Sequence, residues 1–439
     1  MTARGRDKRG GERGQILAMM VISLIALCAL VGVAADLGFF SDYRRRMQTA
    51  ADAAAMAGAQ QLLRDADSAT YTKIRSAALD GSTSNGFTDS ADDALVAPNW
   101  PPSSGFHVGN PSFVEAIITQ PRPTIFMAIL GFQSATVSAR AVAGIVDANL
   151  CILALNQTQP KAINLNGSFT VDAQCRVADN SNDPDALDDS GGAILKAKSI
   201  AVTGDVGGNK SNLTPAPQTG VPREPDPFAR LSAPTFSPTC TSADCNVNHS
   251  SSSYTNCTIN NTGTYTLSPG TYCGGITVHG SSGCSTDVTF QPGLYVLYGG
   301  GFNVNGGCIH GTGVTFYNTG ATSGPNKYSG VTITGSVSGG LYAATTGAMA
   351  AILFFGDRTL TLPGGQTDTI NGGTNLTLEG TLYFPRDPVK FAGGSSSTGA
   401  AAYSILIADA ITFTGGATFN DDFTKLPNGS PTKTVALAE

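Results

Sequence analysis

An uncharged apolar run near the start of the chain limits most strongly how this protein can fold. From Ile16 to Ala35 no residue is charged, and only Ser23 and Gly32 interrupt the apolar character. At about 1.5 Å per residue, a helix over this run is roughly 30 Å long, which matches the hydrocarbon core of a bilayer. We therefore predict a transmembrane helix over residues 15–36, whose membrane-embedded residues include Ile16, Leu24, Leu30 and Ala35.

Basic residues before the run indicate its orientation. Residues 1–14 form a basic tail, although the whole chain of 439 residues has a formal net charge of −6. Under the positive-inside rule this tail stays in the cytoplasm, and the chain after Asp36 crosses the membrane. The alternative is a cleaved signal peptide with a processing site at the small residues 33–35, but the run is long for that. Both interpretations place the rest of the chain outside the cytoplasm.

The cysteines agree with an exported chain. Cys28 lies in the apolar run, and the other eight of the nine cysteines lie between Cys151 and Cys308. An even set in an oxidising compartment indicates disulfides. Our preferred pairs are Cys151 with Cys175 and Cys284 with Cys308, although the sequence alone leaves the connectivity open. The alternative is a zinc site, without the paired short spacing of structural zinc ligands. Its ligands would be Cys240, Cys245, His249 and Cys257.

The stretch after the run favours a helical stalk that continues the membrane helix. Residues 40–65 contain no Pro and are dense in Ala, Gln, Met and Arg, which are good helix formers. Ala50, Ala54 and Gly58 lie four apart on one face, so their small side chains allow another helix to approach closely. Two interpretations stay open, a partner-binding face and a helix that packs on its own domain.

A small α+β domain is expected to include this stalk within residues 37–148. A second helix is predicted from about residue 66 to 86, where Asn85 and Gly86 give a turn signal. Residues 113–120 and 135–146 are typical of strands, and residues 124–131 between them have helical spacing. A long N-terminal helix that leads into a small sheet is the general plan of pilins.

Several N-terminal motifs resemble the TadG-like pilus-assembly family of the tight-adherence (Flp) system. They are GERGQ at residues 11–15, VAADLG at 33–38 and RMQTAADAAAMAGA at 46–59. QPRPT at 120–124, followed by VSARAVA at 137–143, is similar to the usual sequel. The resemblance implies a single-pass inner-membrane protein that faces the periplasm and helps to assemble or anchor a thin adhesive pilus. It implies pilus subunits or other pilus-assembly proteins as partners, and no catalytic activity.

Short β-branched or aromatic triplets, separated by Gly, Asn, Ser and Thr, fill the region 149–420. Residues 275–278 and 288–290 recur as 301–304 and 314–316, each 26 positions later. Stacking of such short units into one column is what a parallel β-helix does. We therefore predict a mostly β fold with a C-terminal β-helix-like domain, and a β-sandwich is the alternative. Residues 179–238 are expected to be a Pro-rich loop, and residues 421–439 a C-terminal tail.

Charged clusters are interpreted as structural. The acidic residues of 179–189 could hold calcium, but they lack the glycine-centred spacing of a calcium loop, so a solvated loop is favoured. DGSTS at 80–84 matches a metal-site string of von Willebrand A domains, but it follows an expected helix and is read as a capped turn. A polysaccharide-cleaving β-helix would need charged groups on successive rungs. The obvious candidates are Asp357, Arg358, Arg386 and Asp387.

Composition and motifs together lead to one functional expectation. Only 13% of the residues are charged and no basic domain is present, so a nucleic-acid partner is not expected. We expect a non-enzymatic, inner-membrane-anchored component of Flp pilus assembly that needs no cofactor or metal and lies on the periplasmic side. The alternative is an exported β-helical adhesin or glycan-binding protein, and less favoured still is a polysaccharide-cleaving enzyme.

Overall fold

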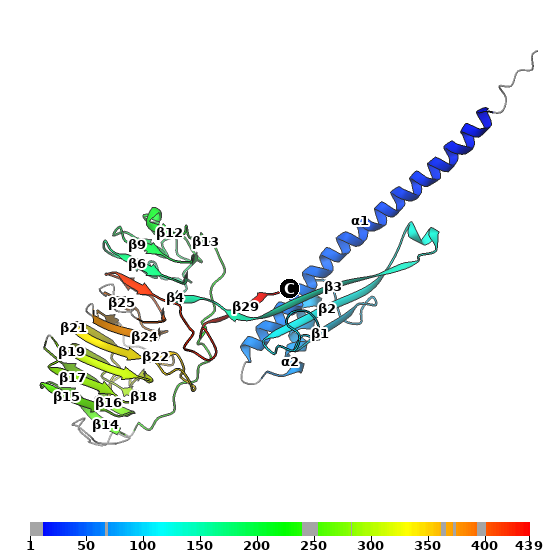
Figure 1. The fold of residues 1–439 in the computed structure, drawn as a ribbon. Coiled ribbons are helices and arrows are strands. Elements are labelled where there is room, and N and C mark those ends of the chain that lie inside the picture. The colour runs from blue at the N-terminus through cyan, green and yellow to red at the C-terminus, as the bar shows by residue number, and fades with distance from the viewer. Residues whose placement is uncertain are drawn as a thin grey trace, which may run out of the picture. The chain divides into compact units, whose positions relative to one another are not determined.

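The fold is that of a computed structural model, which describes residues 12–65, 69–238, 253–281, 283–360, 366–371, 375–392 and 401–439 (Figure 1). The chain forms two compact units. Unit 1 comprises Met1–Val146 and Lys433–Glu439, and unit 2 comprises Asp147–Thr432. Unit 2 is therefore an insertion between two segments of unit 1.

Helix α1 (Glu12–Arg64) joins the apolar run and the expected stalk in one continuous element. Its side chains from Leu17 to Val31 that the structure describes are exposed. From Met47 onward one stripe is buried, because small apolar residues recur every three or four positions and face the same side. This stripe contains Met47, Ala50, Ala51, Ala54, Ala55, Ala59 and Leu62.

Unit 1 packs this stripe against helix α2 (Tyr71–Ser84) and a small sheet. The sheet has the order β1 (Leu95–Asn99), β2 (Phe113–Pro123), β3 (Ser134–Asp147) and β29 (Lys433–Leu437). β2 and β3 form an antiparallel hairpin that ends in the 3-10 helix η1 (Met127–Leu130). Alternate residues of β2, among them Val114, Ala116 and Ile118, point into the core, as expected for a half-buried strand.

The C-terminal segment differs from the expected tail. β29 lies beside β3, and the Ala438 amide donates to the Val142 carbonyl at 2.8 Å. The sequence KTVAL is short, and its pattern predicts no particular partner strand. Its place in the sheet depends on a pairing between residues that lie far apart in the chain.

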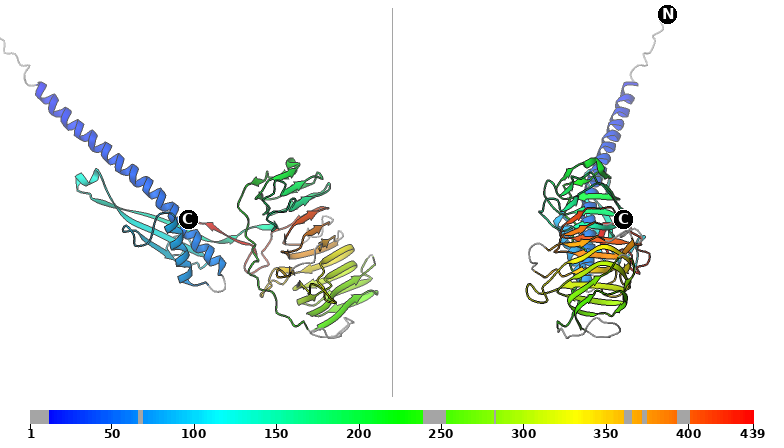
Figure 2. Two further views of the ribbon diagram at one scale, coloured as in Figure 1. Left: turned by 180° about the vertical axis from the view of Figure 1, so that it is seen from behind. Right: turned by 90° about the vertical axis from the view of Figure 1, so that its left-hand side faces the viewer.

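Unit 2 is a stack of short, parallel strands, so the β-sandwich alternative is wrong and the mostly β fold class with a parallel β-helix is confirmed. Figure 2 shows the same stack from two further directions. The first series of strands is β4 (Leu150–Ala154), β5 (Ile163–Leu165), β6 (Thr170–Ala173), β7 (Arg176–Asp179), β8 (Leu187–Asp189), β9 (Ile194–Lys196), β10 (Ser199–Val202), β11 (Val206–Gly208), β12 (Leu213–Thr214) and β13 (Gln218–Thr219), with the 3-10 helix η2 (Lys210–Asn212) before β12.

A second series completes the stack. It consists of β14 (Ser253–Ile259), β15 (Gly263–Leu267), β16 (Gly270–His279), β17 (Thr286–Phe290), β18 (Gly293–Tyr298), β19 (Phe302–Thr312), β20 (Val314–Thr319), β21 (Val331–Tyr342), β22 (Ile352–Gly356), β23 (Asp368–Ile370), β24 (Asn375–Phe384), β25 (Val389–Phe391), β26 (Ser404–Ala408), β27 (Ile411–Phe413) and β28 (Ala417–Phe419).

The order of the rungs in space differs from their order in the chain. β26 pairs with β4, β27 with β5, and β28 with β6. The end of the second series therefore stacks on the start of the first, and the stack runs from β14 through β26 to β4 and on to β13. In Figure 1 its colours run from green through yellow and orange to red, and then to cyan and green again. The chain enters and leaves this stack in its middle.

Residues 179–238, predicted as one long loop, contain two different structures. Up to β13 they form further rungs, because Leu187, Leu195 and Ile200 point into the core despite the many turn residues around them. Only residues 220–238, which we call the strap, lack strands. Figures 1 and 2 show the strap as a green trace along one side of the stacked strands.

The core of unit 2 is built from columns of like side chains. Tyr272, Tyr295, Phe316 and Phe354 follow one another on successive rungs, with ring centroids 5.1 to 5.8 Å apart. The 26-residue repeat is only partly reflected in the stacking. Val278 lies beside Val304, as the repeat predicts, but residues 288–290 of β17 pair with β19 and not with 314–316. β19 is long enough to pair with both β16 and β17, so the two copies of the sequence repeat do not occupy equivalent positions in the stack.

Candidate functional site

Helix α1 is long and apolar enough to cross a membrane. Its most apolar stretch has a mean hydropathy of 2.4, and 11% of that stretch is buried within the protein. Leu24 and Leu30 are exposed, as is Ala35, while the side chain of Ile16 lies outside the described residues. The basic tail up to residue 11 also lies outside them. A row of exposed leucines and valines on a helix requires an apolar surrounding, which a bilayer supplies.

Asp36 connects the end of the apolar run to the β2–β3 hairpin. Its carboxylate accepts hydrogen bonds from the backbone amides of Ile125, Phe126 and Met127 at 3.1, 2.9 and 2.7 Å. These amides open η1, where unpaired N–H groups carry partial positive charge. The side chain is buried, so the three donors replace the water that an exposed carboxylate would bind. Asp36 thus ties the hairpin to the helix.

Gly32 lies one helical turn before Asp36 on the same face. A Cβ at this position would lie 2.8 Å from the Cβ of Phe126, which is closer than carbon atoms approach without repulsion. Only glycine therefore allows the Phe126 side chain to pack directly on the helix. Gly32 and Asp36 were interpreted from the sequence only as features of the span, and their contact with the hairpin was not predicted. The spacing of Gly and Asp on one helix face was a usable signal for it.

The small-residue face of α1 is internal. Ala50 and Ala54 lie in the core of unit 1, and a Cβ on Gly58 would lie 2.8 Å from a methyl group of Val114 on β2. A partner could bind this face only if its side chains were exposed. The sheet and α2 of the same unit cover them. The close approach that small residues allow is used within the chain.

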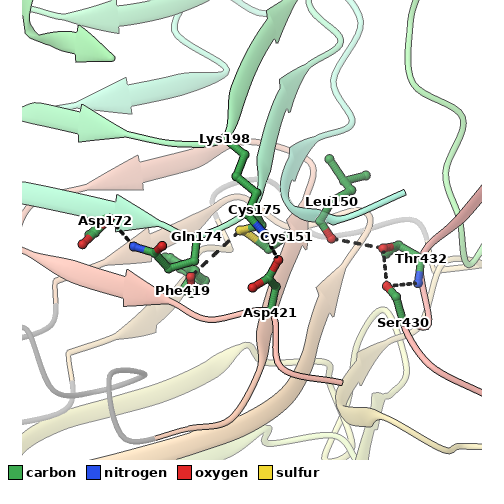
Figure 3. Close-up of a disulfide and its surroundings, with 10 residues drawn as sticks. All are labelled: Leu150, Cys151, Asp172, Gln174, Cys175, Lys198, Phe419, Asp421, Ser430 and Thr432. Atoms are coloured by element: carbon green, nitrogen blue, oxygen red, sulfur yellow. Dashed lines mark hydrogen bonds and ion pairs between the residues drawn. A yellow bond between two sulfur atoms is a disulfide. The ribbon is translucent and has the colours of Figure 1, made fainter. Parts of the chain in front are cut away.

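Two disulfides join the pairs that the sequence analysis preferred. Cys151 is bonded to Cys175, and Cys284 to Cys308. Figure 3 shows the first pair beside Leu150, whose carbonyl accepts a hydrogen bond from the Thr432 hydroxyl at 3.2 Å. Cys257 is also disulfide-bonded, so it is no zinc ligand, while Cys240, Cys245 and His249 lie outside the described residues. The first disulfide therefore fastens the rung where the chain enters unit 2.

Three of the five acidic residues of 179–189 are buried structural groups, whereas Asp183 is half-buried and Asp185 is exposed, so the predicted solvated loop is only partly correct. Asp179, Asp188 and Asp189 are buried. The Asp179 carboxylate accepts from the amides of Ile163 and Ser181 at 3.0 and 2.9 Å, and Asp188 pairs with Lys161 at 3.0 Å. Asp179 fixes the corner between rungs because its oxygens satisfy backbone donors that the turns leave free.

The strap covers an apolar column on the outer side of one face of the stack. Tyr317, Phe355 and Tyr383 stand next to one another on neighbouring strands and are buried. Phe228 of the strap meets Tyr383 with ring centroids 5.4 Å apart, and Phe236 meets Tyr317 at 6.3 Å. The aromatic residues of the strap therefore shield a face that would otherwise be exposed and apolar.

Polar contacts hold the strap in place. The Asn180 side chain donates to the Glu224 carbonyl at 2.8 Å and accepts from the Glu224 amide at 2.7 Å. The Arg358 guanidinium donates to the carbonyls of Phe228, Ala229 and Leu231. A groove of about 500 Å³ borders these contacts and is also lined by Arg223 and Arg386. Arg223 of the strap donates to backbone carbonyls as well. Of the three guanidinium groups that line the groove, those of Arg223 and Arg358 therefore hold the strap in place.

The charged candidates for sugar cleavage are engaged in similar contacts. Asp357 accepts from the hydroxyls of Thr319 and Thr359, both at 2.7 Å. Asp387 is 1% exposed and accepts from the Tyr328 hydroxyl. Burial raises the pKa of the Asp387 carboxyl, but a general acid must also reach its substrate, and Asp387 has no exposed face. Among the described residues no group of three or more His, Cys, Asp or Glu side chains could hold a metal ion.

Comparison with known proteins gives one match. Residues 14–61 match the family described as putative Flp pilus-assembly TadE/G-like. No curated protein and no solved structure matches the chain. The matched segment contains the apolar run, Gly32, Asp36 and the buried small-residue face of α1, and it ends shortly before the helix does.

Proposed function

We propose that this chain is a non-enzymatic component of Flp pilus assembly, because residues 14–61 match the putative Flp pilus-assembly TadE/G-like family. In this proposal α1 anchors the chain in a bacterial inner membrane, and units 1 and 2 lie on the periplasmic side, where they scaffold or anchor the pilus. Its partners are pilus subunits or other pilus-assembly proteins.

The observation that carries the proposal is the continuity of α1. One helix of 53 residues contains the exposed apolar run and the buried stripe of unit 1. A folded unit that shares its main helix with the membrane span is held close to the bilayer. A structural component of a membrane assembly requires such a fixed position, whereas a freely secreted adhesin does not.

The periplasmic side is supported by two independent features. The basic residues before the apolar run favour a cytoplasmic N terminus. Disulfides such as Cys151–Cys175 form and persist in oxidising compartments. Both features agree with units 1 and 2 outside the cytoplasm. The non-enzymatic part of the proposal is supported by Asp357 and Asp387, whose carboxylates are engaged by neighbouring hydroxyls.

Cell fractionation tests the location. We expect the chain in the inner-membrane fraction with its N terminus intact, and we expect protease added to spheroplasts to digest units 1 and 2. A chain that begins near Asp36 and is released from the membrane would contradict the anchor. It would favour an exported adhesin or glycan-binding protein instead.

Deletion of the gene followed by complementation tests the role. We expect loss of surface pili on deletion and full recovery with the wild-type chain. Recovery is also expected with a chain that carries Asp357→Asn and Arg386→Ala, because neither side chain is assigned a catalytic task. Loss of pili with this folded, membrane-bound variant would argue for an enzyme.

A further inference from the structure

The β2–β3 hairpin of unit 1 has an apolar tip that the described residues leave largely exposed. We propose that the hairpin tip, residues 124–133, inserts into the boundary layer of the same bilayer that α1 spans, on the side where unit 1 lies. The inference rests on the membrane anchor of the proposed function. It adds a second point of contact between the chain and the lipid.

The chemistry of the tip is that of a lipid contact. Ile125, Ile129 and Phe132 are 63%, 82% and 60% exposed, and Phe126 is 44% exposed. No charged residue occurs between Arg122 and Arg140. A cluster of large exposed apolar side chains in a segment without charged residues is unusual on a surface that faces water, and it marks an interaction site.

The contacts of the tip with α1 set its depth. Phe126 packs on Gly32, and Asp36 holds the amides at the start of η1. Gly32 lies within the apolar run, about 6 Å before Asp36 at the helical rise of roughly 1.5 Å per residue. The tip is therefore level with the last apolar turn of the span. Leu30 and Val31 on that turn are 67% and 70% exposed, so the helix and the tip both expose apolar side chains at the same level.

This depth selects lipid as the occupant. If α1 spans the bilayer, Leu30 and Val31 lie against acyl chains, and the tip beside them meets the same medium. Apolar faces that bind at the membrane surface reach about 5–10 Å into the boundary between head groups and acyl chains. Two contacts also fix the height and rotation of unit 1 on the bilayer, which one helix alone does not.

Depth-dependent fluorescence quenching tests the inference on the full chain. The natural tryptophan is removed by Trp100→Phe, and a probe is introduced by Ile129→Trp at the tip. Leu24→Trp reports on the span, and Phe106→Trp, a 90% exposed position elsewhere in unit 1, serves as the control. The variants are placed in vesicles of phosphatidylethanolamine and phosphatidylglycerol that contain phosphatidylcholine brominated at the top or at the middle of its acyl chains.

We expect the Ile129→Trp probe to emit at shorter wavelength than the Phe106→Trp control. We also expect lipid brominated at the top of the chain to quench it at least about twofold more than lipid brominated in the middle, as suits an interfacial depth. The Leu24→Trp probe should show the opposite order. Phe132→Trp gives a second reading at the tip in case Ile129→Trp fails to fold.

Three results would overturn the inference. Tip probes that are unquenched while the Leu24→Trp probe is quenched leave the anchor in place and remove the tip contact. Tip probes with blue-shifted emission but no bromine quenching indicate that protein, a second copy or a pilus subunit, covers the tip. If the Leu24→Trp probe is also unquenched, the membrane anchor of the proposed function fails as well.

Discussion

One buried carboxylate in each unit makes the stability of that unit depend on pH, and the two dependences have opposite signs. Glu115 on β2 is buried, yet it accepts hydrogen bonds from Ser103, Ser104 and Asn99 and pairs with Arg140 at 2.6 Å. Burial alone would raise the pKa of its carboxyl. The hydrogen bonds outweigh burial and lower the pKa to about 2.

A lowered pKa makes unit 1 sensitive to acid. The stabilisation by Glu115 is present above its unfolded pKa of 4.5 and is lost as the pH falls to about 2. We expect the free energy of unfolding of unit 1 to fall by about 3 kcal/mol over this range. Trp100, the single tryptophan of the chain, lies in unit 1, so its fluorescence measures this unfolding. Glu115→Gln should flatten the acid limb, and an unchanged slope in that variant would contradict the assignment.

Asp179 gives the opposite sign in unit 2. Burial raises the pKa of its carboxyl to about 7, although the amides of Ser181 and Ile163 favour the charged form. Its stabilisation is therefore complete below about pH 4 and is lost as the pH rises to about 7. We expect amide exchange at Ile163 and Ser181 to accelerate over this range beyond the intrinsic effect of pH. In Asp179→Asn, which stays neutral, this acceleration should disappear, and its persistence would point to another group.

At the scale of elements, the strap is the part of unit 2 that depends most on side-chain contacts. It has no strands, and Arg358 holds three of its carbonyls. Hydrogen bonds from a charged group contribute about 1.5–3 kcal/mol each in favourable cases. In Arg358→Ala we expect proteolysis within residues 220–238 to be at least about tenfold faster, because local opening becomes easier.

Arg386→Ala is the matched control for the strap. Arg386 lines the same groove, and among the described residues it donates to the Leu360 carbonyl at 3.5 Å, which lies outside the strap. We expect its removal to leave the cleavage rate of the strap almost unchanged. Equal acceleration in both variants would mean that groove charge, and not the contact with the strap, protects this segment.

The elements differ in how far the sequence could predict them. The apolar run determines α1, because periodicity and length suffice for a membrane span. β2 and β3 are long and alternate clearly, and they were predicted within a few residues. β1 was not predicted, and neither was the pairing of β26 with β4, since short strands with similar patterns do not specify distant partners. Asp36 was seen only as the end of the span, because its partners, the amides of residues 125–127, carry no side-chain signal.

At the scale of the whole molecule, the first unit depends on the last residues of the chain. β29 extends the sheet of unit 1, and Arg140 pairs with Glu439 as well as with Glu115. We expect a chain that ends at Thr432 to lose about 2 kcal/mol or more of unit 1 stability, because one strand of the sheet is removed together with its backbone hydrogen bonds.

The tryptophan fluorescence of Trp100 again provides the measurement for this truncation. The protease resistance of unit 2 should remain as in the full chain, because all its rungs lie before Lys433. Glu439→Gln separates the effect of the ion pair from that of the strand, and it should cost less than the truncation. If unit 1 unfolds at the same denaturant concentration with and without these residues, β29 contributes nothing to its stability.

The insertion of unit 2 between β3 and β29 has a mechanical consequence. The Ala148 amide donates to the Thr432 carbonyl at 3.0 Å. The two chain segments that connect unit 2 to unit 1 therefore start next to each other in unit 2. In a solenoid each rung contacts only its neighbours, and a pull on an end rung would peel rungs off one at a time. Here tension from α1 reaches the middle of the stack through two chain segments at once. The first rung that it meets carries the Cys151–Cys175 bridge, so the end rungs bear no load from the anchor.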